Sequence, residues 1–124
     1  MRSFVINGET WRVVRVPAGD PRLVDRTGEP RLATTNPRDR LICVQVGVQP
    51  PLLDKVVIHE IAHAITMSWG LLPRMRSEAM RGDVTGLEEW AAQLVENHSI
   101  EALEAARTVL GRPVCVRGLC HGVV

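Results

Sequence analysis

Apolar and polar positions alternate in short runs along the first half of the chain, and turn-forming residues close each run. The runs RSFVI at 2–6 and WRVVRV at 11–16 flank Asn7-Gly8. An Asn-Gly pair between two β-rich runs predicts a hairpin. Residues 40–47 alternate in part and predict a further strand, and RLATT at 31–35 predicts a short edge strand.

The pattern changes to a helical period in the second half. A helix is predicted over 51–69, with Gly70 at the position just past a helix end that glycine favours. After a polar connection, the apolar period predicts a second helix over 85–97, and Ser99 is expected to cap a third over 100–110. Strands followed by helices predict an α+β fold. We expect a single domain over residues 1–124, with a small, mostly antiparallel sheet and the helices on one of its faces.

Length and charge narrow the class of protein. The 124 residues carry a formal net charge of +1, one Phe and no Tyr, which argues against a nucleic-acid-binding surface. The N-terminus lacks the apolar region of a signal peptide, and no apolar run is long enough to span a bilayer. The cysteines Cys43, Cys115 and Cys120 are odd in number, which predicts reduced thiols. We therefore expect a cytoplasmic protein that binds neither nucleic acid nor membranes.

The candidate chemistry is concentrated in HEIAH, residues 59–63. Positions i and i+4 share one face of a helix, with Cβ atoms about 5–6 Å apart. His59 and His63 can therefore both reach one Zn²⁺ at about 2.0–2.1 Å. Glu60 lies one step around the helix, close to the ion but poorly aimed to ligate it. It can accept a proton from a zinc-bound water, whose pKa is about 7, so the set predicts metal-assisted hydrolysis of an amide.

The residues that flank this pentapeptide are apolar on nearly every side of the predicted helix, which predicts a buried helix. A buried glutamate and two buried histidines are costly unless they are paired or bind a metal. The structural alternative is two core histidines bonded to backbone carbonyls, with Glu60 facing solvent.

The stretch VVIHEIAHAI, residues 56–65, resembles the active-site helix of HExxH zinc metallopeptidases, which have the zincin-like fold. The resemblance implies His59 and His63 as zinc ligands and Glu60 as general base. It also implies a small sheet before this helix, with an edge strand that binds the substrate backbone, and two further helices after it. The metzincin extension requires Gly and His where this chain has Thr66 and Trp69, so that subgroup is excluded.

A catalytic zinc site needs a third protein ligand beside an open position for water. Helical periodicity places Glu88 at the border of the apolar face and Glu89 on the opposite, solvated face. The pattern Glu88-x-x-Ala91-Ala92 resembles the segment that carries the third ligand in gluzincin-type peptidases, which implies Glu88, with Glu89 as the second choice. Two alternatives stay open. Thr85-x-x-Glu88 also fits a capping box, and another acidic residue can be the ligand.

Residues 41–98 as a whole are similar to small phage-encoded metallopeptidases, in which an HExxH helix is followed by a Glu-Glu-Trp helix. His98 is predicted on the inner face of the second helix and is a candidate donor to the oxyanion of the tetrahedral intermediate. A core or capping histidine is the alternative. The spacing Cys115-x4-Cys120-His121 fits no common zinc module.

The sequence therefore predicts a zinc-dependent metallopeptidase that hydrolyses a peptide bond, with His59, His63 and Glu88 holding Zn²⁺ and Glu60 as general base. We expect a peptide or protein substrate to add as a strand beside residues 40–47. The alternative is a non-catalytic interaction protein of phage or bacterial origin in which zinc stabilises the fold. The substrate, the cleavage specificity and the oligomeric state do not follow from the sequence.

Overall fold

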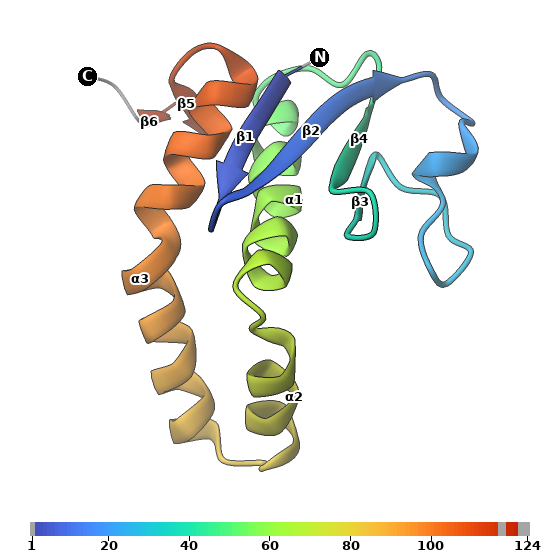
Figure 1. The fold of residues 1–124 in the computed structure, drawn as a ribbon. Helices are drawn as coiled ribbons and strands as arrows, with labels where there is room; N and C mark the ends of the chain where they lie inside the picture. The colour runs from blue at the N-terminus through green and yellow to red at the C-terminus, as the bar shows by residue number, and fades with distance from the viewer. Residues whose placement is uncertain (1, 117–118, 122–124) are drawn as a thin grey trace.

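The computed structural model describes residues 2–116 and 119–121. These residues form an α+β fold in which helices cover a four-stranded sheet (Figure 1). The strands of this sheet are β1 (Arg2–Ile6), β2 (Glu9–Val16), β3 (Ala33–Asn36) and β4 (Leu41–Gln45). A short helix of the 3-10 type, η1 (Pro21–Leu23), follows β2, and the strands β5 (Val114–Val116) and β6 (Leu119–His121) form a separate hairpin.

The sheet has the strand order β1-β2-β4-β3 and is mixed. β1 and β3 pair antiparallel with β2 and β4 respectively, whereas β2 and β4 run parallel, with Val13 opposite Ile42. The strand predicted over 40–47 is thus interior, and β3, predicted as an edge strand, does lie at the end of the described sheet. The expectation that a substrate pairs beside residues 40–47 is wrong, because both edges of β4 are bonded to neighbouring strands.

A tight turn joins β1 to β2, as the Asn-Gly pair predicts. Both turn residues have positive φ, 48° at Asn7 and 76° at Gly8, which is the requirement of the I′ hairpin turn. The hairpin is anchored to a distant serine: Asn7 Nδ2 donates to the Ser68 carbonyl at 3.0 Å, and Trp11 Nε1 donates to Ser68 Oγ at 2.7 Å. These bonds fix the hairpin against the end of the first long helix.

Three helices follow the sheet: α1 (Leu52–Ser68), α2 (Leu72–Met80) and α3 (Val84–Leu110). α1 agrees closely with its predicted range. It ends in a Schellman motif, since Gly70 has φ 63° and the N–H groups of Leu71 and Gly70 donate to the carbonyls of Thr66 and Met67 at 2.8 and 3.2 Å.

The other two helices differ from the prediction. α2 occupies the segment expected to be a polar connection, and Pro73 lies in its first turn, where a missing N–H leaves no helical bond unmade. The helices predicted over 85–97 and 100–110 are one continuous helix. Between them the chain has neither Gly nor Pro, and Ser99 is only a weak helix former rather than a breaker.

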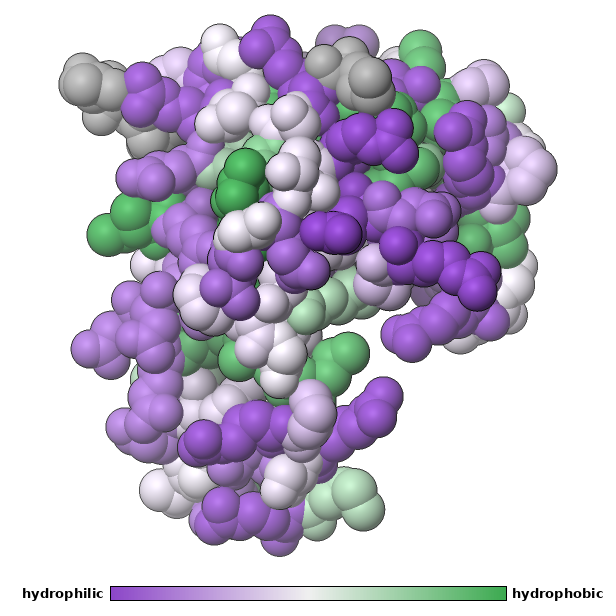
Figure 2. Space-filling view, in the orientation of Figure 1, coloured by the Kyte–Doolittle hydropathy of each residue, from purple (hydrophilic) through white to green (hydrophobic). Residues whose placement is uncertain are grey.

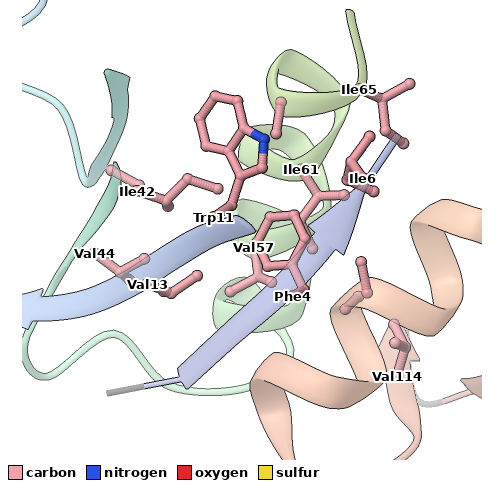
Figure 3. Packing of buried hydrophobic residues seen from close by; sticks show 14 residues of the cluster. Phe4, Ile6, Trp11, Val13, Ile42, Val44, Val57, Ile61, Ile65 and Val114 are labelled. Atoms are coloured by element: carbon pink, nitrogen blue, oxygen red, sulfur yellow. The ribbon is translucent and has the colours of Figure 1, made fainter. Parts of the chain in front are cut away.

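The main core lies between the sheet and the helices α1 and α3 (Figure 3). Trp11 of β2 and Ile61 of α1 are 1% and 0% exposed, and Val114 of β5 closes the same cluster. A smaller cluster of Val16, Leu23 and Cys43 joins η1 to β2 and β4. The buried members of the main core are Phe4, Ile6, Trp11, Val13, Ala33, Ile42, Val44, Val57, Ile61, Ala64, Ile65, Ala105, Ala106 and Val114.

An ion pair between a buried aspartate and a partly exposed arginine fastens the segment after α3 to the first turn of α1. Asp54 is 0% exposed, and its carboxylate accepts bonds from Arg112 Nη1 and Nη2 at 2.7 and 2.6 Å and from the Cys115 N–H at 2.6 Å. The bonds from Arg112 are the main reason that the pKa of Asp54 lies below its ordinary value, and burial opposes them. The carboxylate therefore stays charged inside the protein.

α2 and the first half of α3 project beyond the sheet as a helical lobe, residues 72–97 (Figure 1). Figure 2 shows a notch between this lobe and the part of the molecule that carries β3 and η1. Large apolar side chains of the lobe are exposed, with Met80 at 86%, Val84 at 76% and Val95 at 63%. The lobe thus buries much less apolar surface than the sheet and the second half of α3.

Among the described residues, each helix is too short or too polar to cross a bilayer. Cys43 is a free, buried thiol, as predicted. Cys115 is disulfide-bonded, so the prediction of three reduced thiols is wrong, and cysteine usage no longer supports a cytoplasmic location. The side chains of Cys120 and His121 lie outside the described part of the chain.

Candidate metal centre

Two imidazoles lie side by side on the exposed face of α1. His59 and His63 are separated by one helical turn, and their Nε2 atoms are 3.3 Å apart. The ring centroids are 4.9 Å apart, with the ring planes inclined at 76°. The two Nε2 atoms therefore lie close together. Because the His59 side chain is 69% exposed, a dissolved ion can reach them.

This spacing is the one that a tetrahedral metal ion imposes on two ligands. Two nitrogens bound to Zn²⁺ at about 2.0–2.1 Å with a tetrahedral angle lie about 3.3–3.4 Å apart. The observed separation of the Nε2 atoms is 3.3 Å. A direct hydrogen bond between the rings is the other use of this geometry, but 3.3 Å is longer than the usual 2.9–3.0 Å for a nitrogen donor. His59 and His63 therefore fit a zinc ion as two of its ligands.

Glu60 lies at the side of this pair, toward the sheet. It is 6% exposed, and its Oε1 accepts a hydrogen bond from Thr35 Oγ1 at 2.9 Å. Its other carboxylate oxygen, Oε2, is 3.9 Å from His59 Nε2. One oxygen is thus held by the edge strand β3, and the other faces the ring nitrogens.

The placement of these three residues is the opposite of what the alternative of two core histidines predicts. In that alternative the imidazoles are buried and Glu60 faces solvent, whereas here His59 and His63 are exposed and Glu60 is buried. The prediction of a helix buried on every side is wrong for the same reason. The sheet covers the face of α1 that carries Val57, Ile61 and other core residues, and the histidine face lies outside the core.

Glu88, the predicted third ligand, is not brought to this pair. It is exposed in the second turn of α3. The N-cap of that helix is Asp83, which accepts from the Gly86 N–H at 3.2 Å, so the capping box from Thr85 does not form. α3 runs back along α1 (Figure 1), and His98, ten positions after Glu88, lies beside Trp69, six positions after His63. At 1.5 Å per residue, Glu88 therefore lies about 25 Å from His63 along the helix axes. Glu89 is exposed on the same turn.

His98 is also used elsewhere. Its Nδ1 is 3.1 Å from Glu101 Oε2, and its ring centroid is 5.5 Å from that of Trp69. Trp69 Nε1 donates to the other oxygen of Glu101 at 3.1 Å. Because Trp69 follows His63 by six positions and His59 by ten, His98 lies about 9 Å from His63 and about 15 Å from His59 along the axis of α1. The three side chains join the end of α1 to the middle of α3.

The described residues do not assemble a group of three or more His, Cys, Asp or Glu side chains that could hold a metal. The pair of imidazoles and the nearby Glu60 are therefore what this chain presents to an ion. Sequence reasoning missed Thr35, because the alternation of RLATT predicts a strand but carries no signal for its partner. It also missed the Asp54–Arg112 pair, since the two residues are 58 positions apart.

Comparison with known proteins adds no relationship, because no protein-family model, curated protein or solved structure matches the chain.

Proposed function

We propose that this chain is a zinc-dependent peptidase in which His59 and His63 bind the ion and Glu60 is the general base. The observation that carries the proposal is the 3.3 Å separation of the two Nε2 atoms on an exposed helix face. The buried Glu60 beside them supplies the second part of the chemistry. Because Glu60 is buried, its carboxylate is not one of the many surface charges that are simply solvated by water.

When bound, zinc supplies a water whose pKa is about 7 and polarises the scissile carbonyl. The chain itself handles the proton. Glu60 Oε1 is held by the Thr35 hydroxyl at 2.9 Å, while Oε2, 3.9 Å from His59 Nε2, would accept a proton from a water beside the imidazoles. The same oxygen then returns the proton to the leaving amine.

The edge strand β3 supports a peptide as the substrate class. β3 ends the described sheet, and its Thr35 contacts the general base directly. A peptide that adds to β3 as a further strand gains main-chain hydrogen bonds and passes beside Glu60. The notch seen in Figure 2 next to the β3 side of the molecule leaves space for an extended chain.

Zinc titration of the metal-free protein by calorimetry tests the ion site. We expect His63→Ala to abolish binding, because one imidazole alone cannot hold the ion. His98→Gln is the matched control, since its ring lies against Trp69 and Glu101, and it should bind zinc as the parent does. If the parent and His63→Ala bind zinc with equal affinity, His63 is not a ligand and the proposed site is refuted.

Glu60→Gln separates catalysis from metal binding. We expect this variant to bind zinc and to lose hydrolysis of a fluorogenic peptide library that the parent cleaves, because an amide cannot accept the proton. A parent that binds zinc, gains thermal stability from it and cleaves no peptide in the library would favour the non-catalytic, zinc-stabilised alternative.

The third ligand is tested by a pair of adjacent variants, Glu88→Gln and Glu89→Gln. Neither carboxylate reaches the imidazoles in this structure, so we expect both variants to keep the zinc affinity of the parent. A loss of about tenfold or more in Glu88→Gln alone would show that the helical lobe moves Glu88 to the ion when zinc binds.

A further inference from the structure

A cavity of about 160 Å³ opens between the sheet and the helices, away from the histidine pair. Leu53 and Val57 line it from the face of α1 that packs on the sheet, whereas His59 and His63 lie on the exposed face. Figure 3 shows Val57 together with Val13 and Val44 in the layer between sheet and helix. The aliphatic side chains that line the cavity are Val13, Val44, Leu53, Val57, Val109 and Leu110.

Three arginines surround this apolar space: Arg2, Arg15 and Arg112. Successive residues of a strand point to opposite faces, so Arg2 lies on the same face of β1 as the buried Phe4. Arg15 lies on the same face of β2 as the buried Val13. Strand alternation therefore puts Arg2 and Arg15 on the cavity side of the sheet. Arg112, which follows α3, lines the cavity from the other side and is held in place by Asp54.

The charges at the cavity do not balance. Arg112 is neutralised by Asp54, with N–O distances of 2.7 and 2.6 Å. Arg15 Nη2 donates to the uncharged carbonyls of Gln45 and Val48, at 3.2 and 3.3 Å, and forms no ion pair with another described residue.

Within the described part of the chain, Arg2 has neither an ion pair nor a side-chain hydrogen bond. Its Nη2 lies only 2.9 Å from the point where a Cβ on Gly111 would be, so the guanidinium rests against the residue before Arg112. Two positive charges thus adjoin an apolar cavity, and no carboxylate of residues 2–116 is paired with either of them.

We propose that this cavity binds a small aliphatic monocarboxylate, with the hydrocarbon chain inside and the carboxylate against the arginines. The apolar lining matches the chain, and a planar guanidinium matches the two oxygens of a carboxylate. The volume of about 160 Å³ holds about five groups of the size of a water molecule or a methylene. Hexanoate, with five carbons beyond its carboxylate, is therefore the probe of the right length.

Calorimetric titration of the full chain tests the assignment. We expect hexanoate to bind with one site per chain, and affinity to rise by about fourfold for each methylene from butyrate to hexanoate. Acetate, which lacks the tail, and hexylamine, which reverses the charge, should not bind. Binding of hexylamine as tight as that of hexanoate, or affinity that does not depend on chain length, would overturn the proposal.

A matched pair of variants locates the carboxylate. Arg2→Gln removes the arginine without a charged partner, and we expect it to weaken hexanoate binding about three- to fivefold. Arg12→Gln removes the same charge from the opposite face of β2 and should leave the affinity unchanged. Equal affinities of the parent and Arg2→Gln would show that this guanidinium serves only the end of α3.

A third variant locates the tail. Val109→Phe fills the cavity from α3 and should abolish binding while circular dichroism shows the parent's helix content. If Val109→Phe does not fold, the Arg2→Gln and Arg12→Gln comparison still decides the proposal.

Two sources share this chemistry: a short fatty acid and the C-terminal residue of a peptide. N-acetyl-leucine represents the second source. Tighter binding of hexanoate assigns the cavity to fatty acids, tighter binding of N-acetyl-leucine assigns it to peptide ends, and binding of neither refutes the proposal. Zinc and the variant His63→Ala should not affect either titration, so this inference can fail independently of the proposed peptidase activity.

Discussion

Thr35 in the edge strand β3 donates a hydrogen bond of 2.9 Å to Glu60 in helix α1, across 25 positions of sequence. Glu60 is only 6% exposed, so this bond fixes one carboxylate oxygen inside the protein and leaves the other beside His59. The Thr35 hydroxyl therefore links the edge strand directly to the general base, in addition to the core contacts between β3 and α1.

Replacing Thr35 tests this coupling. Thr35→Val keeps the shape of the side chain but removes the donor, so a buried carboxylate oxygen loses its partner and the free energy of unfolding should fall by about 1–3 kcal/mol. Thr35→Ser keeps the hydroxyl and should lose less than half as much. Urea denaturation measures both, and a Thr35→Val variant as stable as the parent would mean that water replaces the hydroxyl without cost.

Arg112→Ala should be among the most destabilising single changes in this chain. It leaves the carboxylate of Asp54, which is 0% exposed, with the hydrogen bond from the Cys115 N–H but without its positive charge partner. Loss of one member of a fully buried ion pair costs about 3–5 kcal/mol. Because the Arg112 side chain is 34% exposed, we expect a loss near the lower end of that range. Arg76→Ala, at an exposed position of α2, is the matched control and should change stability by less than about 0.5 kcal/mol. Chemical denaturation of both variants in parallel gives the comparison.

The same ion pair predicts a dependence of stability on acid pH. Arg112 holds the pKa of Asp54 below its ordinary value of 3.8. A carboxyl whose pKa is lower in the folded state stabilises that state fully above its unfolded pKa, and this contribution is lost as the pH falls through the folded pKa. The difference in the free energy of unfolding between the parent and Asp54→Asn should therefore be constant at pH values above the unfolded pKa of 3.8 and become smaller as the pH falls below it. A difference that grows as the pH falls would contradict this assignment.

Amide hydrogen exchange should divide α3 into two parts. Ala105 and Ala106 are buried against the core, whereas Val84 and Val95 are 76% and 63% exposed in the helical lobe. Because local opening costs less where less apolar surface is buried, amides of residues 87–97 should exchange faster than those of residues 102–109. Uniform protection along α3 would show that the lobe is stabilised by contacts other than those within the chain.

Local signals in the sequence identified most of the elements. Asn7-Gly8 predicted the hairpin because its turn requires positive φ, and Gly70 predicted the end of α1 for the same reason. The absence of the helix breakers Gly and Pro is equally informative, because it predicts that a helix continues. Treating Ser99 as a cap divided α3 in two, although nothing between Gly86 and Gly111 interrupts a helix.

Long-range placement could not be predicted in the same way. Helical spacing correctly put His59 and His63 on one face, since four positions make about one turn. It did not show which face the sheet would cover, because nearly every neighbour of the pair is apolar. The distance of Glu88 from the pair depends on the direction in which α3 returns along α1, and no local pattern encodes that direction.

The main core takes Phe4 and Ile6 from the first strand and Val114 from β5, close to the other end of the chain. This core is complete only when both groups have been synthesised. Folding of this core should therefore wait until nearly all of these residues have left the ribosome, and a nascent chain stalled within α3 should be sensitive to protease.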